Sequence, residues 1–558
     1  MPELNIDRRG LLTGLGVGAV AGPVVAAPGQ APTVAFLHGV ASGDPHADSV
    51  VLWTRVTPGA ATSRAVPVAW RALSGETVVA SGTTEASPDR DFTVKVIAGG
   101  LRPGVDYTYD FRVGDVASPV GRVRTLPQGP TADVVLGVAS CQLYPGGLFN
   151  AWEAMAAEPR LDAVLHLGDY IYEYGAREND YGGATGAQLS RLHQPPREIL
   201  TLADYRLRHA QYKSDPDLQA AHARAAFICV WDDHEVSNDA WMHGAENHQP
   251  ETEGDFAVKK ATALRAYYEW MPIREPQGGL SLDHVNRSFE FGDLATLAMV
   301  ETRLLNRDKP LDYETDMPVV DGRPDVETFR RALAAPDRDL LGQTQRDWLK
   351  GVLTASKAAG KPWQVLGNQV VMARVNGPDI TRMASEAQIE GLISGLPEAV
   401  QPGIRQVIQL YKLGVPFSLD SWDGYPAGRE RLYAAFAEAG VQPIVLAGDS
   451  HAYWVNDLKD AAGARRAVEF GTSAISSPSV GDAVAPLPIG PLLSANNDEV
   501  VFCDQSAKGY LLLTLTPERA EAKLRSVSTI LAKPFETRTV ATFVVTRDEG
   551  GITAPARR

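Results

Sequence analysis

The stretch "LDAVLHLGDYIYEYG", residues Leu161–Gly175, joins an apolar run to a polar, tyrosine-rich end. The short apolar run is typical of a buried strand, and Asp169 follows directly after it. Tyr172 lies three residues further on, so a tight turn would place both side chains on one side, where they could bind one ion. Each residue also has an ordinary explanation, since an aspartate after a strand is usually a turn or cap residue and Tyr172 could be a core aromatic. The stretch therefore predicts a buried strand, and a site only if other strands bring ligands to the same edge.

Similar apolar strands alternate with amphipathic helices after residue 129, and this alternation predicts a layered α/β domain with both sheet faces covered. The strand-like runs are "DVVLGVASC" (133–141), "AAFICVWDD" (225–233), "KPWQVLGN" (361–368) and "QPIVLAGDS" (442–450). Helical runs such as "LFNAWEAMAAEP" (148–159) and "AGRERLYAAFAEAG" (427–440) separate them. Three further strand-like runs predict a second sheet stacked on the first between helical layers: "RSFEFGDLATLAMVE" (287–301), "RAVEFGTSAI" (466–475) and "GYLLLTLT" (509–516).

Residues 34–125 have a different pattern, in which short alternating runs such as "SVVLWTRVTP" (49–58) are separated by turn residues. This pattern predicts an antiparallel β-sandwich, and "GLRPGVDYTYDFRV" (100–113) is similar to the late strands of fibronectin type III or immunoglobulin-like domains. The expected divisions are an export signal (1–30), an N-terminal β-sandwich (31–128), a catalytic domain (129–530) and a C-terminal extension (531–558), with "TAPARR" expected to be a loose tail.

The composition limits the possible partners. The net charge of −15 disfavours binding to nucleic acid and to anionic lipid. An anionic substrate would therefore need a locally positive site, such as a metal centre. Three cysteines, Cys141, Cys229 and Cys503, imply no disulfide framework and leave one thiol available for chemistry.

The N-terminus has the pattern of an export signal. In "DRRGLLTGLGVGAVAG", Arg8 and Arg9 precede an apolar run, and the small residues near Ala27 suit cleavage. The paired arginines predict export by the twin-arginine machinery; the alternative is a disordered basic leader. Because no other segment is long and apolar enough to span a bilayer, we expect a mature protein without a transmembrane segment, in the periplasm or secreted.

Five of the predicted strands end in side chains that can bind a metal. In α/β sheets, ligand sites lie beyond the carboxyl ends of the strands, so these side chains should converge. Taken singly they are unremarkable, and Cys141 could be a small buried hydrophobe. Taken together they predict a metal site. The predicted ligands are Cys141, Asp169, Tyr172, Asp233, Asn368, Asp449 and His451.

The motifs "GDYIY", "DDHE" and "GDSH", in that order, resemble those of the calcineurin-like metallophosphoesterases, and more closely those of the alkaline phosphatase D (PhoD-like) family. So do "HGVASGDPHADSVVLWTRV" (38–56), "VMAR" (371–374) and "DSWDGYPAGRERL" (420–432). The resemblance covers residues 34–530 and implies a four-layer αββα metallophosphoesterase sandwich after a β-sandwich. One departure is "ETRLLNR" (301–307), where the family more usually has an aspartate in place of Glu301.

Ligand chemistry suggests which metals would bind. Phenolate, thiolate and imidazole ligands favour Fe(III) over zinc, and a neighbouring set of oxygen ligands favours calcium over magnesium or manganese. The oxygen set would be Asp233, Asp449 and the Asn368 amide, with Asp169 bridging the two ions. The resemblance implies the same assignment: Fe(III) at Cys141, Asp169, Tyr172 and His451, with one or more calcium ions beside it.

The expected reaction is hydrolysis of phosphate monoesters or diesters by in-line attack of a metal-bound hydroxide. His234 is the candidate proton donor, unless it only orients Asp233, and Arg303 or Arg374 is the candidate clamp on a phosphate oxygen. His166 is predicted to be a core residue, and Asp232 to support its neighbours without binding metal.

Two alternatives remain open at the level of sequence. A phospholipase D-type phosphodiesterase could use the same site on phospholipid headgroups instead of small phosphate esters. A binding protein could use the N-terminal module to recognise a polymer, with the larger domain as an inactive scaffold.

Overall fold

The computed structural model describes residues 34–382, 384–395, 398, 401–485 and 487–558. The predicted export signal, residues 1–30, lies outside this described part of the chain. The α-helices are α1 (Asn150–Ala156), α2 (Gly183–Leu189), α3 (Leu202–Lys213), α4 (Pro216–Arg224), α5 (Pro250–Glu253), α6 (Phe256–Trp270), α7 (Val326–Leu333), α8 (Gly342–Ala358), α9 (Glu386–Ser394), α10 (Gln401–Tyr411), α11 (Pro426–Ala439), α12 (Val480–Ala483) and α13 (Ile489–Asn496).

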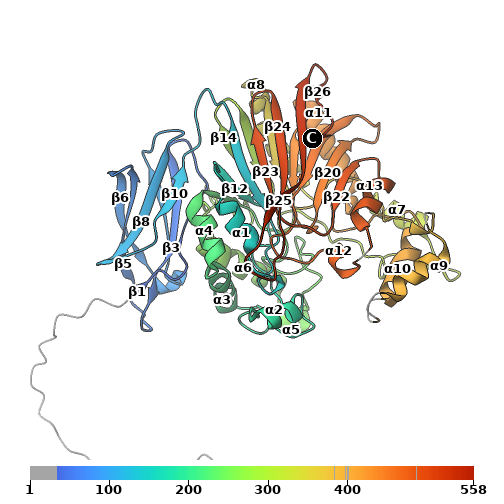
Figure 1. Cartoon of the computed structure of the whole chain (residues 1–558), viewed down its shortest axis with the longest axis horizontal. Helices are drawn as coiled ribbons and strands as arrows, with labels where there is room; N and C mark the ends of the chain where they lie inside the picture. Colours follow the sequence, from blue (N-terminus) through green and yellow to red (C-terminus); the bar gives the residue numbers. More distant parts are fainter. Residues whose placement is uncertain (1–33, 383, 396–397, 399–400, 486) are drawn as a thin grey trace, which may run out of the picture.

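The largest sheet has 11 strands (Figure 1). At its centre β11, β12 and β13 are parallel, so their carboxyl ends share one edge. In spatial order the strands are β26 (Gly551–Ile552), β25 (Thr537–Asp548), β24 (Arg519–Val527), β23 (Lys508–Leu515), β11 (Val134–Ala139), β12 (Ala163–His166), β13 (Phe227–Cys229), β2 (Val40–Gly43), β3 (Ser49–Arg55) and β7 (Thr93–Gly99), with β27 (Ala556–Arg557) beside β25.

The second large sheet has seven strands, and its central members β15, β18, β19 and β21 are parallel. In spatial order they are β14 (Arg287–Phe291), β15 (Ala295–Met299), β18 (Trp363–Gly367), β19 (Ile444–Ala447), β21 (Arg465–Gly471), β20 (Tyr453–Lys459) and β22 (Val500–Asp504). Alternate residues of these strands belong to two cores. Val365 packs in a cluster that also contains Leu136 and Val164 of the first sheet, whereas Leu366 packs with Leu349 and Leu432 of the helices α8 and α11.

The N-terminal strands do not form a body separate from the first sheet. β2 is parallel to β13, with Gly43 opposite Phe227, so β2, β3 and β7 continue the sheet that carries β11 and β12. The other N-terminal sheet packs its apolar residues against them; its strands are β10 (Gly121–Arg124), β8 (Asp106–Val113), β5 (Val66–Ser74) and β6 (Thr77–Ala86), with β9 (Val116–Ala117) beside β8. The short strand pairs β1 (Val34–Ala35) with β4 (Thr57–Pro58) and β16 (Val319–Val320) with β17 (Arg323–Pro324) complete the described set.

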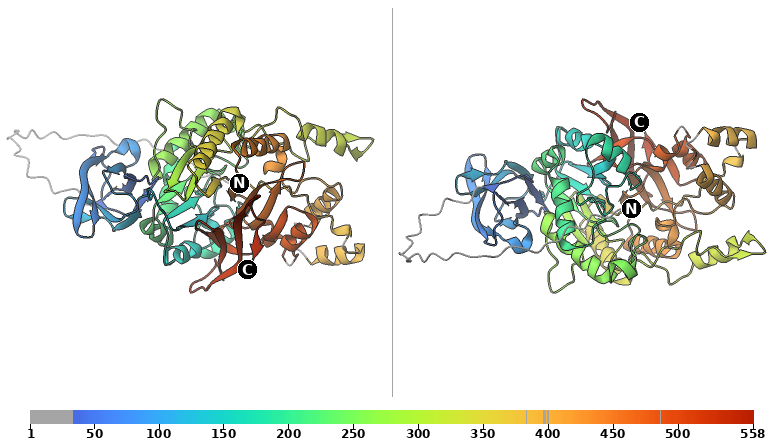
Figure 2. Two further views of the ribbon diagram at one scale, coloured as in Figure 1. Left: turned by 90° about the horizontal axis from the view of Figure 1, so that it is seen from above. Right: turned by 90° about the horizontal axis from the view of Figure 1, so that it is seen from below.

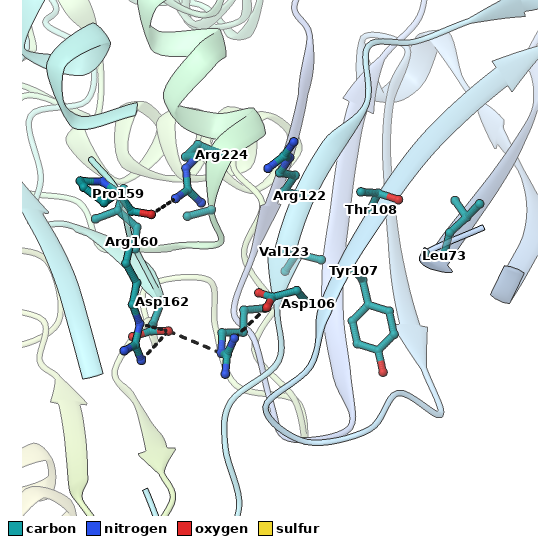
Figure 3. Close-up of a pocket in the computed structure, with 14 residues that line it drawn as sticks. Leu73, Asp106, Tyr107, Thr108, Arg122, Val123, Pro159, Arg160, Asp162 and Arg224 are labelled. Carbon is teal, nitrogen blue, oxygen red and sulfur yellow. Dashed lines mark hydrogen bonds and ion pairs between the residues drawn. The ribbon is translucent and has the colours of Figure 1, made fainter. Parts of the chain in front are cut away.

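A polar cleft of about 530 Å³ lies at this junction, between β8 and β10 and the segment before β12 (Figure 3). Arg160 Nη2 and Arg124 Nε lie 2.9 and 3.5 Å from the carboxylate oxygens of Asp162, and Arg124 Nη1 lies 2.8 Å from Asp106 Oδ2. None of the site residues predicted from the sequence is among the described residues that line it, so the candidate site lies elsewhere.

The mixed α/β class is confirmed, and two local predictions are wrong. "GYLLLTLT" forms β23 of the first sheet, antiparallel to β11 with Leu515 opposite Val134, and is not part of the second sheet. "TAPARR" is not a loose tail, because β27 pairs with β25 and Phe543 and Val545 of β25 are buried. The C-terminal strands cover the edge that β24 would otherwise expose.

Candidate active site

Strand ends from both large sheets meet and bring metal-competent side chains together. In each of three overlapping groups, the candidate ligand atoms lie within 4.8 Å of one another. The groups are Cys141, Asp169 and His451; Asp169, Asp233 and His234; and Asp232, Asp233 and Asp449. Asp169 and Asp233 each belong to two groups, so the three form one continuous cluster.

The backbone at these strand ends is strained. Cys141, Asp169, Asp449 and His451 have φ angles of 60°, 59°, 61° and 57°, in the left-handed region that non-glycine residues rarely adopt. Each such residue costs roughly 1–2 kcal/mol, and such strain is concentrated at functional sites. The sharp turns direct the side chains back toward a common point, and the strain is consistent with a functional role.

Tyr172 and His451 are held against Asp169. Tyr172 Oη donates to Asp169 Oδ2 at 2.8 Å and lies 2.7 Å from Ser477 Oγ and 3.4 Å from His451 Nε2. His451 Nδ1 lies 2.6 Å from the Pro478 carbonyl oxygen. A proton on Nδ1 would donate to that carbonyl and leave the Nε2 lone pair facing Asp169 and Tyr172, as in a metal-ligating histidine.

The cluster holds more negative charge than its arginine balances. Arg303 is fully buried, and its nitrogen atoms lie 2.8 Å from Asp420 Oδ1, 3.1 Å from Asp449 Oδ1 and 3.6 Å from Asp233 Oδ1, with Asp232 on its Nε. Burial, reinforced by the charge of Asp233, still raises the pKa of Asp232 to about 8. Burial and the charge of Asp232 likewise raise the pKa of Asp449 well above its usual range.

Three buried carboxylate oxygens, Asp169 Oδ1, Asp232 Oδ2 and Asp233 Oδ1, have no hydrogen-bond partner among the described residues. Burial and the charge of Asp169 raise the pKa values of the free thiol of Cys141 and of Tyr172 well above their usual ranges. A bound cation would supply the missing partner for the oxygens and favour the thiolate and phenolate. The donor set therefore fits a metal.

His234 lies in the cluster with one nitrogen already committed. Its Nδ1 is 2.8 Å from Glu173 Oε2, and Glu173 also accepts hydrogen bonds from the backbone of Asn238 and the side chain of Asn247. The His234 and Tyr172 rings lie 4.3 Å apart between centroids. Burial opposes the charged imidazolium, but the nearby carboxylates of Asp233 and Glu173 raise the pKa of His234 well above its usual range.

Asn368 is linked to the cluster through Trp422 and Asp420. Its Oδ1 accepts from Trp422 Nε1 at 3.1 Å, and Asp420, two residues before Trp422, contacts Arg303. Arg374 is held by Glu430 and Glu499, which does not support it as a phosphate clamp.

Three further residues, Asp232, Glu301 and His166, have distinct structural roles. Asp232 lies in the ligand-competent cluster, although the sequence predicts only a supporting role for it. Its Oδ1 is engaged by Arg303 Nε, as expected of a supporting residue, whereas its Oδ2 has no hydrogen-bond partner among the described residues. Glu301 caps the loop that carries Arg303, since its carboxylate accepts from the backbone N–H groups of Arg303, Leu304 and Leu305.

His166 is a core residue, as predicted: it is buried, stacks on Trp152, and burial lowers its pKa to about 3.

Comparison with known proteins places this site in a family. The sequence model of the PhoD-like phosphatases matches residues 136–524, which include every predicted site residue. The chain belongs to the PhoD-like phosphatases. The family's N-terminal domain matches residues 23–127. As a PhoD-like phosphatase, the chain is a phosphoric ester hydrolase.

Two relatives extend over nearly the whole chain. Alkaline phosphatase D of Bacillus subtilis (strain 168) is 36% identical over an alignment of 536 residues, and the alignment covers 93% of this chain and 82% of the relative. A solved structure described as "Structure of PhoD" is 32% identical, with a TM-score of 0.75, covering 95% of this chain and 93% of that one. No helix in the described part of this PhoD-like phosphatase is long and apolar enough to cross a bilayer.

Proposed function

We propose that this PhoD-like phosphatase is an exported, metal-dependent enzyme that hydrolyses phosphate monoesters, diesters or both. The observation that carries the proposal is the cluster in which Asp169 links the Cys141–His451 group to the Asp232–Asp233–Asp449 group, with unpartnered carboxylate oxygens at its centre. Fe(III) would be held by Cys141, Asp169, Tyr172 and His451, and one or more calcium ions by Asp233, Asp449 and the amide oxygen of Asn368.

The layering of the catalytic part, the kind of N-terminal domain and the cellular location of the protein belong to the same proposal. The catalytic part would be a four-layer αββα sandwich, and the N-terminal strands would be related to fibronectin-like or immunoglobulin-like domains. The paired arginines Arg8 and Arg9 support export by the twin-arginine machinery to the periplasm or beyond.

The bound cations would supply Lewis acidity and positive charge that offset the phosphate and activate water. The protein residues would orient these groups. Arg303 has its nitrogens directed at Asp232, Asp420 and Asp449, which favours a role in positioning these carboxylates over direct contact with phosphate. The carboxylate of Glu173 holds His234 through the Nδ1 atom of the imidazole. The other ring nitrogen, Nε2, would then donate a proton to the leaving-group oxygen.

A phospholipase D-type phosphodiesterase would use the same residues on another substrate. A panel of nitrophenyl phosphate, bis(nitrophenyl) phosphate and phosphatidylcholine separates the two. We expect turnover of at least one nitrophenyl ester; turnover of phosphatidylcholine alone would replace the phosphatase proposal with the phospholipase one.

The decisive experiment is elemental analysis with visible absorption spectroscopy on the wild type, Tyr172→Phe and Tyr174→Phe. A phenolate on Fe(III) should give a charge-transfer band that Tyr172→Phe loses. Tyr174→Phe, which changes a neighbouring tyrosine outside the proposed ligand set, should keep the band. A colourless, iron-free and fully active wild type would refute the metal assignment.

A further inference from the structure

A second feature of the molecule is an apolar groove of about 550 Å³ between the helices α9 and α10 on one side and α12 and α13 on the other. These helices lie at the opposite end of the molecule from the blue N-terminal strands (Figures 1 and 2). Aliphatic side chains form its walls, including Ile389, Leu392, Val407, Ile408, Val480 and Leu492. Concave, mostly apolar surfaces of this size are typical of small-molecule sites.

Each wall of the groove contains a residue that lies two positions in sequence from a residue in contact with the candidate active site. On one side, Phe417 and Ser418 line the groove, and Asp420 two residues later accepts a hydrogen bond from Arg303 Nη1 at 2.8 Å. On the other side, Val480 lines the groove, and the carbonyl oxygen of Pro478, two residues earlier, lies 2.6 Å from His451 Nδ1. Consecutive Cα atoms are about 3.8 Å apart, so each wall begins within about 8 Å of a residue that contacts the site.

The groove exposes apolar side chains that a soluble surface usually buries. Leu392, Val407 and Val480 are 44%, 38% and 47% exposed, and they come from three different helices that face the same groove. Exposed apolar surface gathered in one place marks a binding site more often than scattered single residues do.

The position of the groove and the charge of the chain restrict its occupant. The N-terminal leader is disfavoured, because cleavage near Ala27 during the proposed export would remove it. A net charge of −15 disfavours docking on an anionic bilayer. A single hydrocarbon chain fits the aliphatic lining, and its phosphate could reach the neighbouring cluster.

We infer that this groove binds the hydrocarbon chain of a monomeric, single-chain amphiphilic phosphate ester whose phosphate lies at the candidate active site. The inference rests on the proposed function, since it assigns a substrate class to the same site. The groove adds apolar contact to the ester's leaving group, and this contact should grow with chain length until the groove is filled.

The test compares ethyl, butyl and octyl phosphate, each below its critical micelle concentration, as substrates of the full-length metal-loaded enzyme. Each buried methylene should raise kcat/KM roughly threefold to fourfold, so octyl phosphate, with four more methylenes, should exceed butyl phosphate roughly 80- to 250-fold. The double variant Leu392→Gln/Val407→Gln should lose most of this gain and keep turnover of ethyl phosphate. Val258→Gln, an equally conservative change at an exposed position of α6, should keep the whole gain.

Calorimetry with octylphosphonate and ethylphosphonate measures binding without turnover, so it separates this inference from the proposed function. Tighter binding of octylphosphonate that is lost in the double variant supports the groove even if no ester is hydrolysed, in which case only the proposed function fails. Turnover of ethyl phosphate without any effect of chain length would overturn the inference, as would a chain-length effect that the double variant retains. Hydrolysis of phosphatidylcholine vesicles without hydrolysis of octyl phosphate would also overturn it.

Discussion

The candidate active site gathers carboxylates around Arg303, whereas a second buried cluster, beneath the N-terminal strands, gathers histidines around Lys213. This histidine cluster consists of His38, His166, His209, His222 and Lys213. Lys213 Nζ lies 3.2 Å from His222 Nε2 and over the rings of Trp53 and Tyr170, at 4.6 and 5.1 Å from their centroids. Burial lowers the pKa of Lys213 to about 7 and the pKa values of His38, His166 and His209 to about 3.

The two clusters respond to burial in opposite ways. A buried histidine can lose its proton and remain as a neutral, stacked ring, as His209 does against Trp270. The carboxylates of Asp232 and Asp233 converge with that of Asp449 and each keep one buried oxygen without a hydrogen-bond partner among the described residues, so a bound cation would stabilise them. Burial therefore serves packing in the histidine cluster, whereas in the candidate active site it gathers groups that could bind a metal.

The largest effect that tests this comparison is expected from Asp169→Asn, because Asp169 joins two of the ligand groups. We expect kcat/KM to fall roughly 1,000-fold, with loss of bound metal, since charge compensation at the phosphate would be lost. Kinetics and elemental analysis measure both. Asp133→Asn, which changes a carboxylate paired with Arg160 in the polar cleft region, should leave both unchanged. Full activity and full metal content in Asp169→Asn would refute metal binding at Asp169 as the difference between the two clusters.

The next effect concerns the balance of charge at Arg303. In Arg303→Met stripped of metal, the buried carboxylates lose their cation, and the free energy of unfolding should fall by about 3–5 kcal/mol. Metal-loaded protein should lose less, because the metal would offset the same charges. Denaturant unfolding with and without a chelator measures the difference. An equal loss of stability in the metal-free and the metal-loaded protein would mean that no bound metal offsets the charge of the carboxylates.

Acid should destabilise the histidine cluster. His38, His166 and His209 have folded pKa values of about 3 and are expected to titrate near 6.5 when unfolded, so between these values the unfolded state binds more protons and stability falls as the pH falls. At pH 5 each of these histidines should lower the free energy of unfolding by about 2 kcal/mol relative to neutral pH. His209→Phe, which keeps a ring beside Trp270, should remove about that much of the pH dependence in denaturant unfolding. An unchanged acid response in His209→Phe would show that His209 does not titrate in this way.

The smallest effect on the free energy of unfolding near neutral pH is expected from Lys213→Met. The folded pKa of about 7 lies below the value of about 10.5 expected when unfolded, so in wild type stability should rise with pH between them. Methionine cannot titrate, so it removes this pH dependence. Near pH 7 it should raise the free energy of unfolding by about 1 kcal/mol, after allowance for the lost contacts with Trp53 and Tyr170. Thermal unfolding across pH 7–10 measures it, with metal content as the control. A pH slope that survives in Lys213→Met must come from other groups.

Much of the fold and of the candidate site could be predicted from local sequence. Strands and helices follow from apolar periodicity, and polar residues directly after strands, such as Asp169 and Asp449, identify a common edge. Sheet membership was harder to predict, because "GYLLLTLT" is equally suited to either sheet until its pairing with β11 is known. The final residues "TAPARR" lack any strand pattern, and they are ordered only because β25 offers them an edge.

The sequence by itself determined which residue types end the strands: a thiol, a phenol, carboxylates and imidazoles in the order typical of PhoD-like phosphatases. Only the tertiary structure decided which of them share a point in space. It added Asp232 to the cluster, directed Arg303 at the carboxylates and held His234 against Glu173. The physical reason is that strand periodicity is local, whereas these contacts depend on left-handed turns and on two sheets whose strands are distant in sequence.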